Sequence, residues 1–264
     1  MKKNITIELK RILNNKTLGS SELASLLNRY FFSIRDDKSK IMKSFSLVKN
    51  ELGYFTTIKS YLNELDNQIK AKGKRDLEKF FIEYSGKTEK ETEIIFNKIK
   101  LHLAKVDSVL TLSRSGTVLG ILKLWYKINK NLKVVVCESR PKFEGRLTAK
   151  ELSDIRIEVE LITDAMIGIY ILKVDAVLIG ADSILRNSNV VNKVGSHALA
   201  LLCKEFKKPF YVVTTKSKYS NKNIFRHNQE DPNEIWSKRV KNLSISNIYF
   251  EEVPKKLITK IFTD

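Results

Sequence analysis

The sequence predicts an α/β protein in which an N-terminal helical domain precedes a Rossmann-like parallel-sheet domain. Residues 1–105 contain no proline, and their apolar residues recur at the three- and four-residue spacing of amphipathic helices. After this region, five short apolar runs are mostly separated by helical patterns of about ten residues, which is typical of βαβ units in a doubly wound sheet. We therefore place one domain at residues 1–105 and the second at residues 106–264.

The N-terminal region is predicted to form five or six helices. Ser20 or Ser21 is a suitable N-cap for a helix that ends near Phe32, and Thr88 is suitable for one that ends near Ala104. No flexible linker rich in Gly and Ser follows, so we expect the two domains to be in fixed contact. The helices either brace the sheet domain or present a docking surface to a partner protein.

The five runs are rich in β-branched residues and nearly continuous in apolar character, as parallel strands buried on both faces tend to be. The expected strands are 108–111, 133–137, 157–162, 176–179 and 210–214. Ligands of such sheets bind beyond the carboxyl ends of the strands, so the loops there are the candidate site. The polar stretch 216–240 is expected to be a surface loop with a short helix.

The first of these loops is Ser113-Arg114-Ser115-Gly116-Thr117, which opens a helix expected over 117–128. A helix N-terminus offers unpaired N–H donors and a positive dipole, and Ser, Arg and Gly at that point suit a phosphate. The alternative is that Ser115 only caps the helix and Arg114 lies in solvent.

The second loop, Glu138 to Arg146, contributes two further cations. Pro141 biases Arg140 away from helical geometry and keeps the loop extended. Arg146, at the start of the next helix, could converge with Arg140 on one anion through bidentate hydrogen bonds. The alternative is a structural ion pair between Glu138 and Arg140 that holds the loop.

The remaining polar candidates follow the third and fourth strands. Asp182 ends the fourth strand, where an acid is placed for proton transfer or for binding a sugar hydroxyl. Asp164 is a second acid, although it equally suits capping of the next helix. Asn192 and Lys193 could contact a phosphate or the Asp182 carboxylate, and Gly195 would permit close backbone approach.

Together and in this order, the loop sequences resemble one family. It comprises the alpha, beta and delta regulatory subunits of translation initiation factor two-B, their archaeal relatives, methylthioribose-1-phosphate isomerase and ribose-1,5-bisphosphate isomerase. The resemblance covers about residues 106–264, and the segments 228–231 and 250–264 look like the closing segments of the alpha-type subunit. The segments that carry it are Ser113-Arg-Ser-Gly-Thr117, Glu138-Ser-Arg-Pro141, Asp164-Ala165, Gly180-Ala-Asp-Ser183 and Asn192-Lys-Val-Gly195.

The resemblance implies a sugar phosphate at the first loop and a homodimer through the sheet domain. It also implies that the isomerases use a cysteine in the first loop with the aspartate that matches Asp182, and Ser113 stands at the cysteine position here. A serine hydroxyl ionises far less readily than a thiol and needs a neighbouring base, but this loop contains no histidine. We therefore expect a non-catalytic alpha-type regulatory subunit or homologue that binds initiation-factor partners and keeps a sugar-phosphate or nucleotide pocket.

Two alternatives stay open. The first is an isomerase of ribose-1,5-bisphosphate or methylthioribose-1-phosphate, in which Asp182 moves the proton and Arg114, Arg140, Arg146 and Lys193 hold phosphate. The second is a basic RNA-binding accessory protein, because the net charge of +18 is spread along the chain rather than confined to a tail. The same charge also suits a lysine-rich solvated surface, and no ribonucleoprotein-type motif of aromatic and basic residues is present.

Other functional classes have little support. No apolar run approaches the roughly 18 residues of a membrane helix, so no membrane segment is expected. Cys137 and Cys203 occupy apolar surroundings, which indicates buried thiols and a cytoplasmic protein. The three histidines are scattered, so we expect no metal site and no cofactor.

Overall fold

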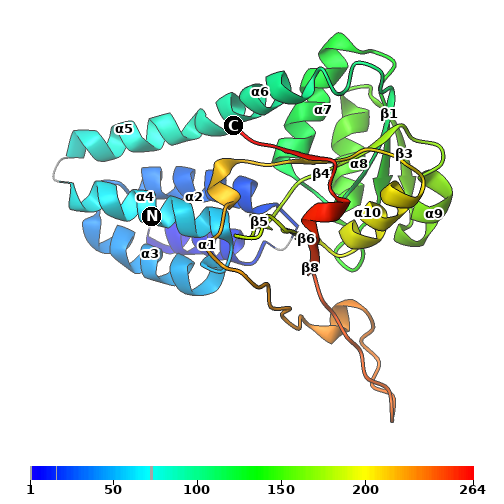
Figure 1. The fold of residues 1–264 in the computed structure, drawn as a ribbon. Helices are drawn as coiled ribbons and strands as arrows, with labels where there is room; N and C mark the ends of the chain where they lie inside the picture. The colour runs from blue at the N-terminus through cyan, green and yellow to red at the C-terminus, as the bar shows by residue number, and fades with distance from the viewer. Residues whose placement is uncertain (1, 16, 72–73) are drawn as a thin grey trace.

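The computed structural model describes residues 2–15, 17–71 and 74–264 of the chain. Helices come first and an α/β sheet unit follows, so the predicted fold class is confirmed (Figure 1). The domain boundary itself stays a prediction. The helices of the N-terminal part are α1 (Lys2–Leu13), α2 (Ser20–Ser33), α3 (Lys38–Leu52), α4 (Thr56–Lys70), α5 (Lys74–Ser85) and α6 (Lys87–Ile99).

The first five helices share one apolar core, which includes the fully buried side chains of Leu27, Phe31 and Tyr61. The Asn28 side chain is buried beside this core. Its Nδ2 donates hydrogen bonds to the carbonyl oxygen of Phe81 at 2.8 Å and to Ser85 Oγ at 3.1 Å. A buried amide is costly unless it is paired, so these bonds favour one register between α2 and α5. Helix α6 differs from the others, because its apolar face joins the core of the sheet unit.

Two predicted helix starts are displaced. The N-cap of α2 is Gly19, one residue before the predicted serines, and the Glu22 carboxylate accepts a hydrogen bond from the Gly19 amide at 3.2 Å. Helix α6 begins at Lys87 after the cap residue Gly86, so Thr88 is already inside the helix. It ends at Ile99, and the residues that follow form turns rather than continuing the helix to Ala104.

The main sheet has the order β3-β2-β1-β4-β7-β9, and every neighbouring pair is parallel. All five expected strands are present, and β9 is an additional strand that the sequence analysis did not predict. The strands are β1 (Ser108–Leu112), β2 (Lys133–Cys137), β3 (Glu158–Ile162), β4 (Ala176–Ile179), β7 (Phe210–Val213) and β9 (Lys260–Phe262). One expectation was wrong: β3 is an edge strand that exposes Leu161 by 46% rather than being buried on both faces.

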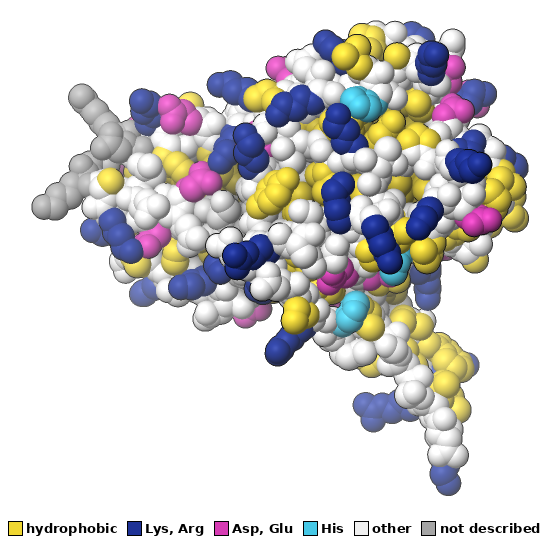
Figure 2. All heavy atoms as spheres, in the orientation of Figure 1, with side chains coloured by type: hydrophobic (Ala, Val, Ile, Leu, Met, Phe, Trp, Pro, Cys, Tyr) yellow, Lys and Arg dark blue, Asp and Glu magenta, His cyan; other side chains and the backbone are white. Residues whose placement is uncertain are grey.

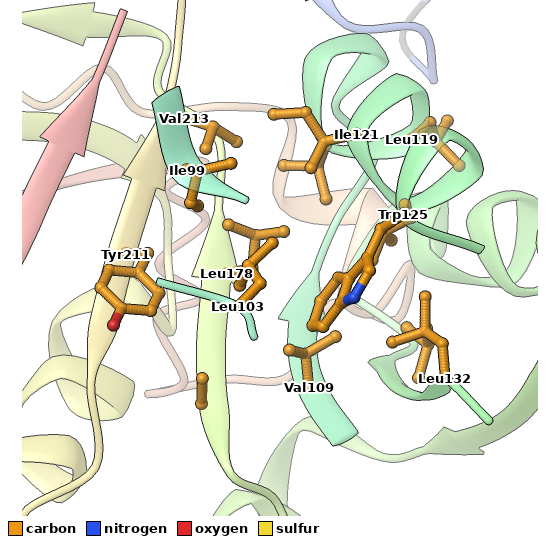
Figure 3. Packing of buried hydrophobic residues seen from close by; sticks show 14 of the residues in the cluster. Ile99, Leu103, Val109, Leu119, Ile121, Trp125, Leu132, Leu178, Tyr211 and Val213 are labelled. Carbon is orange, nitrogen blue, oxygen red and sulfur yellow. The ribbon is translucent and has the colours of Figure 1, made fainter. Parts of the chain in front are cut away.

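Helices cover both faces of this sheet (Figure 1). Figure 3 shows the core on the side of α6 and α7, where Trp125 points toward Val109 and Leu132. Trp125 is 2% exposed, so its large ring fixes the distance between α7 and the sheet. The covering elements are α7 (Gly116–Ile128), α8 (Glu144–Asp154), the 3₁₀ turn η1 (Asp164–Met166), α9 (Ile167–Tyr170) and α10 (Ser196–Glu205).

A second, antiparallel sheet has the order β5-β6-β8. Its strands are β5 (Ser183–Ile184), β6 (Val190–Lys193) and β8 (Phe250–Val253). Asn192 and Lys193 were expected to lie in a loop, and this was wrong because they pair with Glu251 and Phe250. The short apolar part of β6 gave too little alternation to be recognised without its partner strand.

The C-terminal part contains three 3₁₀ turns: η2 (Lys216–Lys218), η3 (Pro232–Glu234) and η4 (Lys255–Leu257). Between η2 and β8 the chain leaves the body and forms a projecting arm, drawn in orange in Figure 1. None of the helices within the described residues is both long enough and apolar enough to cross a membrane.

Candidate functional site

The strand order of the main sheet places its switch point between β1 and β4. The chain passes outward from β1 through β2 to β3, and in the other direction from β4 to β7 and β9. The loops after β1 and β4 therefore face one another, as ligand-binding loops of doubly wound sheets do. A Cβ added at Gly180 would lie 2.4 Å from Ser115 Oγ, so this close approach requires glycine.

A hollow region lies over these strand ends and between the two parts of the chain. We distinguish a strand-tip pocket of about 30 Å³, an inner cavity of about 220 Å³ and an outer cavity of about 420 Å³. Asp182 lines all three, so we call the combined space the cleft. The residues shared by the inner and outer cavities are Tyr54, Phe55, Asp182, Glu230, Tyr249 and Phe250.

The strand-tip pocket is lined by the beginnings of two helices. Ser115 caps α7, and its Oγ accepts a hydrogen bond from the Val118 amide at 3.4 Å. Gly116 and Thr117, the first residues of that helix, line the pocket opposite Gly19, the cap residue of α2. Two helix N-termini thus present positive dipole ends and amide donors to one small space, which is an arrangement that favours an anion.

Lys218 and Asp182 are two of the charged residues that line this pocket, and Arg114 is the third. Lys218 is only 5% exposed, and its Nζ donates a hydrogen bond to Ser20 Oγ. Burial lowers the pKa of Lys218, and the neighbouring Asp182 carboxylate opposes that shift. Burial raises the pKa of Asp182, and the ammonium groups of Lys218 and Lys193 oppose this change. The two groups therefore support each other's charged forms, and both line the strand-tip pocket.

Arg114 lies at the inner cavity and the strand-tip pocket, but carboxylates already surround its guanidinium. Nη2 lies 2.7 Å from Glu22 Oε1 and 2.7 Å from Glu151 Oε2, and the side chain is 12% exposed. The alternative that placed Arg114 in solvent was therefore wrong. The pairs tie the first loop to α2 and α8, so Arg114 connects the two parts of the chain beside the pocket.

Asn192 and Lys193 are also found at the cleft. Asn192 lines the strand-tip pocket and donates a hydrogen bond from Nδ2 to Ser196 Oγ at 2.9 Å. Lys193 lines the inner cavity, and its Nζ lies 2.6 Å from Glu144 Oε1 and 4.5 Å from the centre of the Tyr249 ring. The ammonium group is thus held between a buried carboxylate and an aromatic face.

Arg140 and Arg146 do not line the cleft. Arg146 pairs with Glu138 at 2.6 Å, so the expected pair between Glu138 and Arg140 is replaced by a different one. Asp164 accepts a hydrogen bond from the Arg140 amide at 2.7 Å, and this holds the second loop in place. The sequence left open that Arg140 and Arg146 could converge on one anion. Their guanidinium carbons lie 4.9 Å and 3.8 Å from the centre of the Phe143 ring, outside the cleft lining.

Ser113 lines both the strand-tip pocket and the inner cavity. Its φ of 62° is left-handed, and Ser139 Oγ accepts a hydrogen bond from its amide at 2.6 Å. Among the described residues that line the cleft there is no histidine and no cysteine to assist a hydroxyl. Burial instead raises the pKa of Cys137 and of Cys203 to about 12, away from the cleft.

Three residues of the cleft were not predicted from the sequence as site residues: Lys218, Gly19 and Ser20. Lys218 follows β7, so the rule that sites lie beyond the carboxyl ends of strands could have identified it. Its polar surroundings suggested a surface loop instead. Gly19 and Ser20 belong to another part of the chain, and no local pattern brings them to the sheet. Within the described residues, no group of three or more His, Cys, Asp or Glu side chains has an arrangement that could hold a metal ion.

Comparison with known proteins places this architecture among related chains. The family model described as the initiation factor 2 subunit family matches residues 11–264. A putative translation initiation factor eIF-2B subunit 2-like protein of Pyrococcus furiosus is 28% identical over 262 residues, which are 97% of this chain and 93% of the relative. The structure of the translation initiation factor eIF-2B of Pyrococcus horikoshii OT3 superposes with a TM-score of 0.79 at 25% identity, covering 98% of this chain and 94% of that one.

An enzyme is also among the relatives. The ribose 1,5-bisphosphate isomerase of Archaeoglobus fulgidus is 33% identical over 163 residues, or 60% of this chain. The match spans about half of that relative, 52% of its length.

Proposed function

This chain belongs to the initiation factor 2 subunit family, and we propose that its cleft binds a phosphorylated sugar. The observation that carries the proposal is the convergence of two helix N-termini and the buried Lys218 on the strand-tip pocket. Amide donors and an ammonium group together suit a phosphate group, and Asp182 beside them suits a sugar hydroxyl. The inner cavity of about 220 Å³ provides room for the pentose.

In the first candidate function this ligand is bound without being converted. Ser113 stands where the related isomerases are expected to carry a thiol, and no described residue that lines the cleft is a histidine or cysteine. The similarity to the initiation-factor-like relative along nearly the whole chain supports a regulatory subunit. We expect initiation-factor subunits as partners, a homodimer through the sheet domain and a cytoplasmic location.

The second candidate function is aldose–ketose isomerisation of a phosphorylated ribose. It is favoured by the identity to ribose 1,5-bisphosphate isomerase and by the facing charges of Asp182 and Lys218. In this mechanism the ring C1–O4 bond breaks and O4 takes up a proton, while the Asp182 carboxylate accepts the proton of C2 and returns it to C1. The C2 hydroxyl gives up its proton as the C2 carbonyl forms, so the sugar is neither oxidised nor reduced overall. Lys218 would keep Asp182 ionised and contact the phosphate.

One experiment distinguishes the candidates. Ribose-1,5-bisphosphate is titrated into the purified chain by calorimetry, and the recovered sugar is then analysed by NMR for conversion to the ketose. Binding without conversion supports the regulatory function, whereas conversion that Asp182→Asn abolishes supports the isomerase.

A second experiment tests the contact between Lys218 and the phosphate. Lys218→Met should weaken binding by at least about tenfold, because a charge-assisted hydrogen bond contributes about 1.5–3 kcal/mol. Lys150→Met is the control, since Lys150 forms an exposed pair with Asp154 outside the cleft lining. Equal affinity of all three proteins, or no binding by the unaltered chain, would contradict the proposed site.

A further inference from the structure

The edge of the main sheet at β9 carries a group of exposed lysines that the cleft does not use. Lys98 Nζ donates to the Thr263 carbonyl oxygen at 2.7 Å, and Lys260 Nζ lies 3.3 Å from His102 Nε2, so α6 and β9 lie side by side. The amide of Thr259 donates to the Phe210 carbonyl oxygen at 3.0 Å, which brings the turn before β7 to the same edge. We name these the β9-edge lysines: Lys98, Lys100, Lys207, Lys255, Lys256 and Lys260.

These side chains differ from other lysines of the chain in their partners. Among the described residues, no carboxylate lies within 4.0 Å of any β9-edge lysine. By contrast, Lys70 and Lys150 lie 2.6 Å from Asp66 and Asp154 on their own helices. The ammonium groups of these six lysines are therefore not held in direct ion pairs, which leaves them available to a polyanion.

Basic side chains on this face of the molecule are spread out rather than gathered at one point. Figure 2 shows dark blue side chains spread across the face where Figure 1 places α6, α10 and the red C-terminal segment. The packing of α10 against η4 extends the edge beyond the strand itself. A row of flexible ammonium groups suits phosphates repeated along a backbone better than one compact anion.

The aromatic residues of β7 and β9 point inward at this edge, whereas His102 and Phe206 beside the group are exposed. Tyr211 is 7% exposed and Phe262 is 3% exposed, and their ring centres are 5.8 Å apart within the core. Rings that are packed in this way cannot stack on unpaired bases, which is the usual contribution of aromatic residues to single-strand binding. The sheet itself therefore offers no stacking surface at this edge, and the lysines favour the phosphate backbone, which a duplex presents on its outer surface.

We propose that the β9-edge lysines bind the phosphate backbone of double-helical nucleic acid without reading its bases. None of these six lysines lines the cleft. Binding at the edge and binding in the cleft are thus separate activities that can be measured independently.

The test uses fluorescence anisotropy of a labelled RNA duplex of about 20 base pairs at several salt concentrations. The edge variant is K255Q/K256Q/K260Q in the full chain. The control variant K70Q/K79Q/K150Q removes the same charge from lysines that pair with carboxylates on their own helices. We expect the edge variant to bind at least about tenfold more weakly at low salt, with a salt slope reduced by about 3, because each lost phosphate contact contributes about 1.

The control variant should retain nearly the whole salt slope. Equal losses in the two variants would show that net charge alone attracts the duplex, and this would overturn the proposal. No binding by the unaltered chain would overturn it as well, as would tighter binding of a single strand of the same length. Thermal melting of each variant identifies any loss that comes from unfolding.

Discussion

Replacement of Arg114 by alanine separates a structural role from a ligand-binding role. Its guanidinium contacts Glu22 and Glu151 with two nitrogen-to-oxygen distances of 2.7 Å, and Nε also donates to Glu22 Oε2 at 3.1 Å. The exposed fractions of the three side chains are 12% for Arg114, 24% for Glu22 and 33% for Glu151, so the cluster is between a buried and a surface ion pair.

The loss of stability expected for Arg114→Ala follows from this intermediate burial. Breaking a buried pair by removing one partner costs about 3–5 kcal/mol, and a surface pair contributes about 0–1 kcal/mol. We therefore expect Arg114→Ala to lower the free energy of unfolding by about 2–3 kcal/mol. Arg114→Lys should lose about half as much, because an ammonium group keeps the charge but cannot bridge both carboxylates with a planar fork.

Urea denaturation followed by circular dichroism measures the effect. The control is Lys150→Ala, which removes one exposed ion pair on the same helix as Glu151 and should cost less than about 0.5 kcal/mol. An Arg114→Ala protein as stable as this control, but with weakened sugar-phosphate binding, would refute the reasoning and make Arg114 a ligand contact.

Three further predictions concern particular sites. Burial, with the Asp264 carboxylate adding to it, raises the pKa of Glu91 to about 7 from 4.5. Between these two pH values the folded chain keeps a proton that the unfolded chain releases. The free energy of unfolding of the unaltered chain, relative to that of Glu91→Gln, should therefore fall as the pH rises from 4.5 to about 7. Denaturation at a series of pH values measures this difference, and a difference that does not change with pH would contradict the prediction. Gly145→Ala should lower the free energy of unfolding by at least about 1–3 kcal/mol in urea denaturation, because the added Cβ would lie 1.8 Å from a backbone oxygen. Gly168→Ala is the control and should not destabilise the chain, because nothing lies within 4 Å of its added Cβ. The two buried thiols should resist alkylation at pH 8 until urea unfolds the chain, because burial raises the pKa of each to about 12. Mass spectrometry of the alkylated protein measures this.

The local elements of the sheet unit were predictable because their signals lie within short stretches of chain. The run of valines from Lys133 to Cys137 forms β2 with the predicted bounds, and the same is true of Ala176 to Ile179 in β4. A parallel strand buried on both faces needs apolar residues at nearly every position, so it remains recognisable without its neighbours. Strand β9 has only three residues and an exposed lysine, and it was therefore missed.

The sequence by itself determined that an α/β sheet follows a helical part and that Asp182 and the Ser113 loop lie at strand ends. Only the tertiary structure decided which charges reach the pocket. Arg146 follows a strand as expected, yet it pairs with Glu138 outside the cleft, and the buried Lys218 takes a place that no local pattern assigned. The physical reason is that hydropathy patterns specify which face of an element is buried, whereas the partner of a charged side chain depends on elements that are distant in the sequence.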